Sequence, residues 1–290
     1  MSDDTRGIAL MICAIVLFSC MDAMAKAMTQ SIDPIQAIWA RYTGQALVVA
    51  ALIAPRAATV LRAKYPKLQF LRSLFLLGAT VCFFNALARL GLAEATAIMN
   101  LNPVLITLGA ALFLGEKLGI RRLTGITVAL IGALIIIRPG SAVFTPAALL
   151  PLGAALCYSA YALTTRFVGR DEDVWTSLFY TAIVGALVTS ALVPFHWTTP
   201  DTPTLAMMLV IGLFGAASQL LLIRALTLAE ASLVAPFAYS GLIFATLWGL
   251  LLFGEVPDAM TLLGALVIVG AGLYVWRRER QSKVILPPHA

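Results

Sequence analysis

The amino-acid sequence predicts an all-α integral membrane protein whose ten transmembrane helices form two inverted five-helix repeats. Three observations predict this fold: the apolar composition, the length of the apolar blocks, and an internal duplication. Of the 290 residues, 61% are hydrophobic and 12% are charged, whereas soluble domains average about 25% charged residues. The apolar residues form blocks of roughly 17 to 22, and a helix needs about 20 to cross the hydrocarbon core of a membrane.

Proline, glycine and charged residues divide the chain into these blocks, and each block predicts one membrane-spanning helix. In chain order we expect helices at residues 7–28, 34–54, 70–88, 95–115, 120–137, 147–167, 174–194, 204–223, 231–253 and 259–276. No small-residue cleavage site follows the first block, so we expect a retained helix and not a signal peptide. The connections are short and leave no room for a soluble domain.

The lysine and arginine residues predict the orientation, because positive residues are retained on the cytoplasmic side of a membrane. With the N-terminus inside, 16 of the 20 basic residues fall at the cytoplasmic ends of the helices. The sequence therefore predicts a multi-pass protein of a bacterial cytoplasmic (inner) membrane with both termini cytoplasmic. This topology accounts for the net charge of +6, and we expect no nucleic-acid partner.

Two halves of the chain match each other. Residues 112–135 align with residues 251–274, which pairs Glu116 with Glu255, and Lys26 aligns with Arg166. We therefore expect a first repeat at residues 1–140, a second at 141–277, and a cytoplasmic tail at 278–290. Since each repeat holds an odd number of helices, the second enters the membrane from the opposite side, an arrangement typical of secondary transporters.

These features resemble the drug/metabolite transporter superfamily, specifically its EamA-type members. The resemblance rests on the ten short helices, the duplication and a "GE" pair before a glycine-spaced helix in each half, and it covers residues 7–276. It implies transport of a small organic solute through a central cavity lined mainly by the first, third, fourth, sixth, eighth and ninth helices. One position departs from the family pattern: Pro103 aligns with Leu242, where the family often has proline in both halves.

Asp22 and Lys26 stand one helical turn apart inside the first apolar block. Ionisable residues within a membrane span are costly and often functional, and a spacing of four places both on one helix face. One interpretation is that Asp22 binds a coupling proton or a substrate amine while Lys26 tunes its ionisation. The other is a structural ion pair between the two. Asp22 aligns with Ala162 in the second repeat, so it is the asymmetric member.

Further polar side chains within the blocks are candidates for binding the substrate. Arg41 is expected to pair with Asp22 or a carbonyl group, or to meet an anionic group of the substrate. Tyr158 and Tyr161 share a helix face and suit a planar ligand. The predicted substrate-binding residues are Asp22, Arg41, Asn85, Asn100, Asn102, Tyr158, Tyr161, Gln219 and Tyr239. Glu116 and Glu255 are interpreted as solvated turn residues, with gating contacts as the alternative.

The motifs favour a secondary transporter over an enzyme. The chain has no H-E-x-x-H, no G-x-S-x-G and no phosphate-binding G-x-x-x-x-G-K-[ST] loop. We therefore expect no cofactor, and an ion or solute gradient as the driving force. The expected partners are a small-molecule solute, membrane lipid, a coupling proton or ion, and a second copy in a homodimer. Riboflavin uptake is the leading hypothesis for the substrate; the alternatives are export of amino acids or related metabolites, and uptake of nucleosides of the S-adenosylmethionine type.

Overall fold

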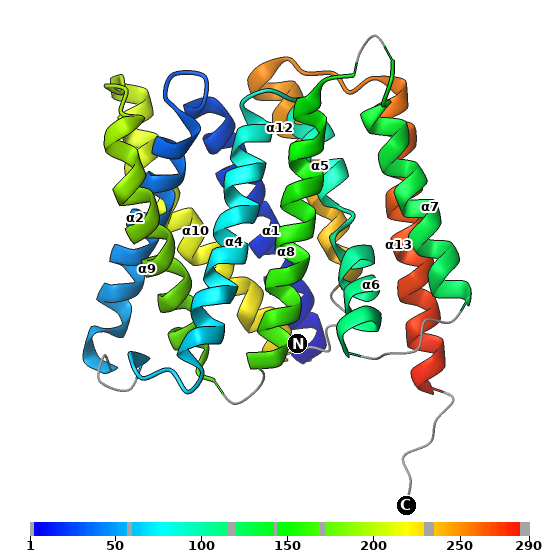
Figure 1. Ribbon diagram of the computed structural model, residues 1–290, viewed down its shortest axis with the longest axis horizontal. Coiled ribbons are helices and arrows are strands. Elements are labelled where there is room, and N and C mark those ends of the chain that lie inside the picture. The colour runs from blue at the N-terminus through cyan, green and yellow to red at the C-terminus, as the bar shows by residue number, and fades with distance from the viewer. Residues whose placement is uncertain are drawn as a thin grey trace, which may run out of the picture.

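The structure is a computed structural model that describes residues 3–56, 60–114, 120–141, 144–168, 172–228 and 235–284. Within these residues all regular secondary structure is helical, and short turns and connections join the helices (Figure 1). The first half contains α1 (Asp3–Met28), α2 (Pro34–Ile53), η1 (Ala54–Arg56), α4 (Pro66–Leu87), α5 (Leu92–Met99), α6 (Asn102–Leu114) and α7 (Ile120–Ile137). The second contains η2 (Pro146–Ala148), α8 (Leu149–Val168), α9 (Val174–Leu192), η4 (Val193–Phe195), α10 (Thr202–Leu228), η5 (Ala235–Tyr239), α12 (Ser240–Phe253) and α13 (Ala259–Val284).

The helices have the lengths that a membrane requires. Among the described residues, eight segments are long and apolar enough to cross a bilayer, and two shorter apolar helices, Leu123–Ile137 and Phe237–Phe253, complete the set. The predicted ten-helix membrane fold is therefore confirmed.

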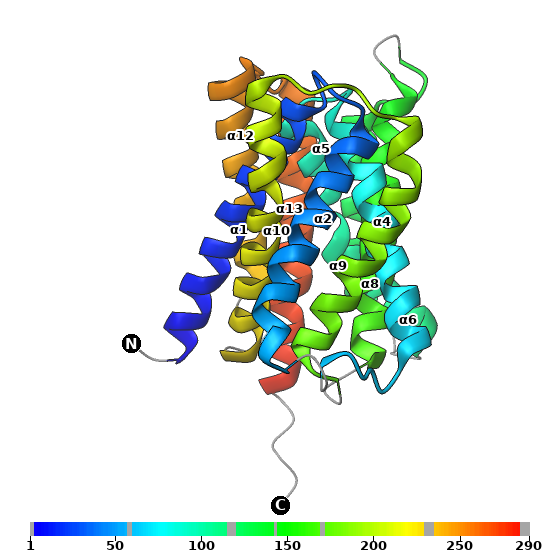
Figure 2. The same ribbon diagram turned by 90° about the vertical axis from the view of Figure 1, so that its left-hand side faces the viewer.

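Both chain termini lie at the same end of the bundle, at the bottom of Figure 1. This end is called the terminus end below, and the opposite end is called the far end. Helix α1 ends and α2 begins at the far end, and the side view in Figure 2 shows α1 rising beside α10 toward α12. An even number of crossings returns the chain to the end at which it began.

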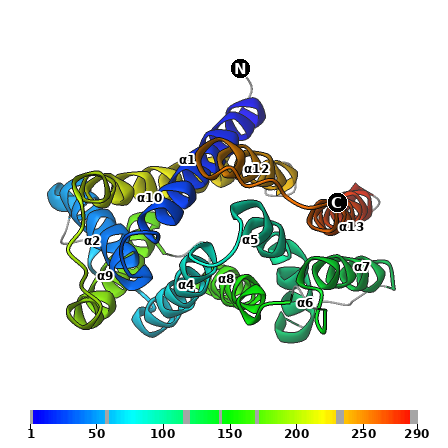
Figure 3. The same ribbon diagram turned by 90° about the horizontal axis from the view of Figure 1, so that it is seen from above.

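The two repeats pack mainly against each other. Helix α1 lies between α10 and α12, α2 packs against α9 and α10, α4 packs against α8 and α9, and α7 pairs with α13 (Figure 3). Small residues allow these contacts to be close, as expected between membrane helices. A Cβ atom on Gly212 of α10 would lie 2.4 Å from the Cα atom of Gly44 in α2, so these two helices touch through their backbones.

The fourth membrane crossing is broken. Helix α5 ends at Met99 and α6 begins at Asn102, where the sequence predicts one continuous helix over 95–115. Pro103 has no N–H group to donate to the Met99 carbonyl, four residues before it. The N–H groups of Asn100 and Leu101 turn to the carbonyls of Thr96 and Ile98, at 3.0 and 3.1 Å. The chain therefore passes through an irregular stretch within the bundle.

A polar layer between the repeats

Asp22 is a half-buried carboxylate in α1. Within the part of the chain that the structure describes, no hydrogen bond or ion pair reaches it. Arg41 of α2 is the charged group that acts on it electrostatically. A carboxylate inside a membrane span is normally paired or functional, so Asp22 remains open to a ligand or an ion.

Arg41 is almost fully buried, with 4% of its surface exposed. Its Nη1 donates to the Thr80 hydroxyl of α4 at 2.8 Å, and its guanidinium lies 4.7 Å from the ring centroid of Tyr42. The Thr80 hydroxyl donates to the Leu76 carbonyl at 2.9 Å, so the Tyr42 hydroxyl donates to Thr80, at 3.0 Å. The Arg41 Nε is buried without a hydrogen-bond partner among the described residues. One donor of a fixed cation is thus left for another group.

Five polar residues from five helices lie at a similar depth. Counting 1.5 Å per residue from the far end of each helix, Asp22, Arg41 and Thr80 lie about 9 to 11 Å deep, and Asn100 and Tyr158 about 12 to 14 Å. Together they are called the polar layer: Asp22, Arg41, Thr80, Asn100 and Tyr158. Helix α4 contacts α1, α2, α5 and α8, so it connects the elements that carry them.

The break in the fourth crossing adds unpartnered polar atoms near this layer. Within the described ranges, the Asn100 Nδ2, the Asn102 Oδ1 and the Thr96 Oγ1 are buried without hydrogen-bond partners. Ser159 of α8 places its hydroxyl 3.4 Å from the Asn102 carbonyl, while it donates to the Ala155 carbonyl at 2.7 Å. Buried polar atoms without partners cost free energy, and in transporters interrupted helices supply such groups to substrates and ions.

The rings of Tyr158 and Tyr161 lie on one face of α8, with centroids 5.6 Å apart and planes tilted by 46°. The Tyr161 hydroxyl accepts a hydrogen bond from Arg72 Nη2 at 3.1 Å, and the Arg72 guanidinium lies 4.9 Å from the Tyr161 ring centroid. Tyr161 is therefore held in place from below, whereas no hydrogen bond to the Tyr158 hydroxyl is formed within the described residues. A role of Tyr158 in meeting a ligand stays a prediction.

Sequence reasoning missed the burial of Arg72. The charge pattern places this residue among the basic residues that determine topology, but only 3% of its surface is exposed. Its remaining donors bind Thr165 at 2.7 Å and the Gln69 side chain at 2.8 Å. Its Nη1 also donates to the Ser177 carbonyl of α9 at 3.3 Å. No carboxylate among the described residues pairs with Arg72, so neutral groups from α4, α8 and α9 stabilise its charge.

Three more of the predicted residues, Asn85, Gln219 and Tyr239, are not members of the polar layer. The Asn85 side chain donates to the Val81 carbonyl of its own helix and accepts a hydrogen bond from Arg89, four residues later. Gln219 is buried in α10, one turn beyond Gly215. Tyr239 of η5 points toward α13, because a Cβ on Gly272 would collide with its hydroxyl. Their roles in binding remain predictions.

Of the two interpretations of Asp22 and Lys26, the structural ion pair between them is wrong. The Lys26 Nζ lies 2.8 Å from the Glu255 carboxylate and donates to the carbonyls of Leu87 and Leu90. Glu255 also accepts a hydrogen bond from the Leu92 N–H at 2.8 Å, so this partly exposed turn residue also makes contacts with the first repeat. Glu116, its repeat counterpart, lies outside the described residues.

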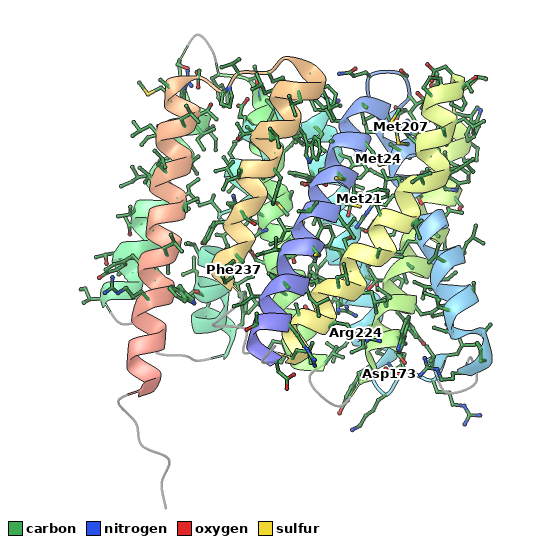
Figure 4. The ribbon with its side chains drawn as sticks, turned by 180° about the vertical axis from the view of Figure 1, so that it is seen from behind. Met21, Met24, Asp173, Met207, Arg224 and Phe237 are labelled. Carbon is green, nitrogen blue, oxygen red and sulfur yellow. The ribbon has the colours of Figure 1, made fainter. Side chains whose placement is uncertain are left out.

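Methionine side chains fill much of the contact between α1 and α10. Figure 4 shows Met21 and Met24 of α1 beside Met207 of α10, and all three belong to one apolar cluster. Unbranched methionine side chains tolerate changes in packing, a property that suits the rocking of repeats expected of inverted-repeat transporters.

A cavity of about 300 Å³ opens at the far end, outside the polar layer. Its lining includes Glu94, Arg138, Glu255 and Asp258. The Arg138 guanidinium forms a hydrogen-bonded ion pair with Asp258, and this contact lowers the pKa of Asp258 to about 2. Among the described residues, no three histidine, cysteine, aspartate or glutamate side chains gather where they would hold a metal ion.

Comparison with known proteins agrees with this architecture. The chain is 28% identical to the pseudopaline exporter CntI of Pseudomonas aeruginosa, over 94% of this chain and 97% of that protein. It is 25% identical to the S-adenosylmethionine uptake transporter of Rickettsia bellii, over 95% of each chain. It is 33% identical to the riboflavin transporter of Rhizobium johnstonii, over 77% of this chain and 74% of that one.

The fold is also found in a solved crystal structure. That structure matches with a TM-score of 0.68 at 20% identity, over 94% of this chain and 98% of the other. The model of the EamA-like transporter family matches residues 5–138 and again residues 145–277. The chain therefore belongs to the EamA-like transporter family, and it is a multi-pass membrane transporter of small molecules, not an enzyme.

Proposed function

We propose that the protein takes up riboflavin or a closely similar heteroaromatic metabolite across the bacterial cytoplasmic membrane. The observation that supports this proposal is the half-buried ring of Tyr158, which lies 5.6 Å from the tilted ring of Tyr161 and close in depth to Asp22 and Arg41. A tyrosine face suits the flat ring system of a flavin, since stacked aromatic pairs contribute about 0.5 to 1.5 kcal/mol beyond area burial. Similarity to riboflavin transporters of Rhizobium johnstonii and Vibrio cholerae, at 33% and 31% identity, supports the same choice.

Asp22 and Arg41 complement the edge of such a ring. The pyrimidine edge of a flavin presents an N–H donor between two carbonyl acceptors. The free carboxylate of Asp22 is able to accept from the N–H, and the unpartnered Arg41 Nε is able to donate to a carbonyl. Since buried polar groups are normally hydrogen-bonded, a ligand with this edge would satisfy both.

S-adenosylmethionine is the second candidate, and the unpaired Asp22 carboxylate favours it. Its adenine is also heteroaromatic, and its sulfonium and ammonium groups are cations that an acidic side chain attracts. Similarity to the Rickettsia uptake transporters, at 25% identity over 95% of the chain, supports this reading. Export of an amino-acid-like metabolite is the third possibility, because the pseudopaline exporters match the chain over 94% of its length.

We propose that the terminus end faces the cytoplasm, because most lysine and arginine residues lie at that end of the helices. In this orientation the polar layer lies nearer the periplasmic surface. Asp22 serves in addition as the site of the coupling proton, since it is ionisable, half-buried and unpaired.

Complementation tests the substrate. A riboflavin auxotroph that expresses the protein is expected to grow on low external riboflavin, and the empty vector is not. Growth that depends on S-adenosylmethionine in the corresponding auxotroph would select the second candidate. If neither strain grows although the protein is present in the membrane, the proposal that it takes up either compound is excluded.

A further inference from the structure

We infer that Lys26, Glu255 and the N-terminus of α5 form a latch that holds the far end of the transporter closed above the polar layer. The Lys26 Nζ lies 2.8 Å from the Glu255 Oε1, and the Leu92 N–H donates to the Glu255 Oε2 at 2.8 Å. Both carboxylate oxygens are therefore used, one for each partner. The inference rests on the proposed carrier function, because a latch matters only if the far end opens.

The latch joins elements of both repeats. Lys26 belongs to α1 and Leu92 to α5, while Glu255 follows α12 in the second half of the chain. Lys26 also donates to the carbonyls of Leu87 and Leu90 at the end of α4, and it lies 5.4 Å from the ring centroid of Phe253. When Glu255 leaves, the first-repeat contacts of Lys26 stay intact. Glu255 is thus the part that moves relative to the rest.

The position of the latch places it over the polar layer. Phe18, Asp22 and Lys26 follow one another at intervals of four residues, so they lie along one face of α1. Lys26 is one turn nearer the far end than Asp22, and its side chain is only 7% exposed. A solute that enters from the far end along this face of α1 must pass it.

The backbone holds Glu255 in a defined position. Gly254 ends α12 with a φ of 65°, in the left-handed region that suits glycine. The N–H groups of Gly254 and Glu255 donate to the carbonyls of Leu250 and Gly249, at 3.1 and 2.9 Å. Glu255 is therefore fixed to the end of α12, and a tilt of α12 moves its carboxylate away from Lys26.

Glu255 also remains in contact with water, since its side chain is 30% exposed. It lines the far-end cavity of about 300 Å³. A buried ion pair is strongly destabilised when one partner is lost in a dry interior, but a carboxylate with access to water regains hydration when it leaves. The pair is therefore stable when closed and still able to open.

A second ion pair at the same end provides the matched control. Arg138 and Asp258 also join the two repeats, but they lie next to α7 and α13, which pack along each other. This pair is more exposed, with 25% and 54% of the two side chains accessible. Since α7 and α13 lie to one side of the bundle (Figure 3), this contact is expected to stay closed during transport.

Thiol labelling tests the latch. All four native cysteines are replaced, and Phe18→Cys, a half-buried position beneath Asp22, serves as the reporter. A membrane-impermeant methanethiosulfonate is applied to each side of the membrane in turn. A separate variant, Phe195→Cys, shows which side holds the far end, because Phe195 follows α9 and is 84% exposed. Glu255→Gln is expected to raise the labelling rate of the reporter thiol from that side about tenfold, equivalent to about 1.4 kcal/mol.

The controls decide between a latch and a general loosening. Lys26→Met removes the other partner and is expected to raise labelling in the same direction, so it replaces Glu255→Gln if that variant does not fold. Asp258→Asn removes a carboxylate at the same end and is expected to leave the rate unchanged. An unchanged rate in both latch variants, or an equal rise in Asp258→Asn, would overturn the inference. The assay uses no transported solute, so its result is separate from the choice of substrate.

Discussion

Lys26 pairs with Glu255 of the second repeat at 2.8 Å, and not with Asp22, its neighbour one helical turn away. Glu255 offers Lys26 a partner that is itself held by the N–H of Leu92. The consequence for Asp22 is that no cation of the described residues binds its carboxylate, and Arg41 acts on it only through its electrostatic field. The basic residue is therefore part of the scaffold between the repeats, and the proposal assigns the acidic residue to the transported species.

Asp22→Asn is expected to abolish gradient-driven uptake and to leave the amount of protein in the membrane unchanged. The amide is similar in size but does not bind and release a proton. Proteoliposomes that measure both gradient-driven uptake and substrate counterflow separate the two proposed roles. Loss of the first alone assigns coupling to Asp22, loss of both assigns substrate binding, and normal gradient-driven uptake would return Asp22 to a structural role.

Tyr158→Ala is expected to weaken riboflavin binding by about twofold to thirteenfold, because a stacked aromatic contact is worth about 0.5 to 1.5 kcal/mol. Tyr158→Phe keeps the ring and is expected to bind nearly as well as the wild type. Quenching of flavin fluorescence on titration with purified protein gives both dissociation constants. Equal affinities of the alanine and phenylalanine variants would contradict a stacking role.

Arg72→Lys is expected to destabilise the protein, although it keeps the positive charge. A lysine ammonium does not reproduce the planar fork that binds Thr165, Gln69 and Tyr161. Leaving a buried polar group without its partner costs about 1 to 3 kcal/mol. Arg277→Lys, at an exposed position, is the matched control. Thermal unfolding in detergent measures both, and equal melting temperatures would contradict the tight binding of Arg72.

Gly212→Ala is expected to separate α2 from α10 and to lower the melting temperature clearly. The added methyl group would meet the Gly44 Cα at 2.4 Å, and a backbone contact of this kind has no side chain that is able to rotate away. Gly270→Ala in α13 is the control, since a Cβ there meets nothing within 4 Å. This second variant is expected to be neutral or slightly stabilising, by up to about 1 kcal/mol. Similar losses in both would contradict the packing explanation, because alanine is the better helix former and the Cβ clash is present at Gly212 but not at Gly270.

The Arg138–Asp258 pair predicts a pH dependence. The hydrogen bond from Arg138 lowers the pKa of Asp258 from 3.8 to about 2. A depressed carboxylate pKa stabilises the folded state above pH 3.8, and this contribution is lost as the pH falls toward about 2. The melting-temperature difference between wild type and Asp258→Asn should therefore stay constant from pH 8 to about 5 and shrink below about 4. The difference is expected to be small because Asp258 is largely exposed, and a difference that grew on acidification would contradict the assignment.

The number of membrane crossings follows directly from the sequence because hydrocarbon thickness fixes the length of an apolar helix. The break in the fourth crossing at Asn100 could not be predicted from the sequence. Proline is tolerated in transmembrane helices, where neighbouring groups satisfy the freed carbonyls, so Pro103 alone does not distinguish a kink from a break. The neighbours that decide it, such as Ser159, come from another helix.

The partners of the charged residues also could not be predicted from the sequence. A spacing of four predicts a local pair between Asp22 and Lys26, but a contact across the repeats replaces it. The sequence places Arg72 near the membrane surface because it predicts that the third helix begins at residue 70. Helix α4 begins at Pro66, which moves Arg72 inside the bundle. Local rules identify ionisable residues in a span, whereas their partners depend on how helices distant in sequence pack.

Counterflow of labelled riboflavin into proteoliposomes tests the central claim most directly. The account predicts transient accumulation that saturates with external riboflavin, requires unlabelled riboflavin inside, and is lost in Tyr158→Ala at low substrate. Equilibration at the same rate with or without internal riboflavin, without saturation, would contradict a carrier. Absence of any riboflavin movement, together with saturable counterflow of S-adenosylmethionine, would support a carrier whose substrate is S-adenosylmethionine and not riboflavin.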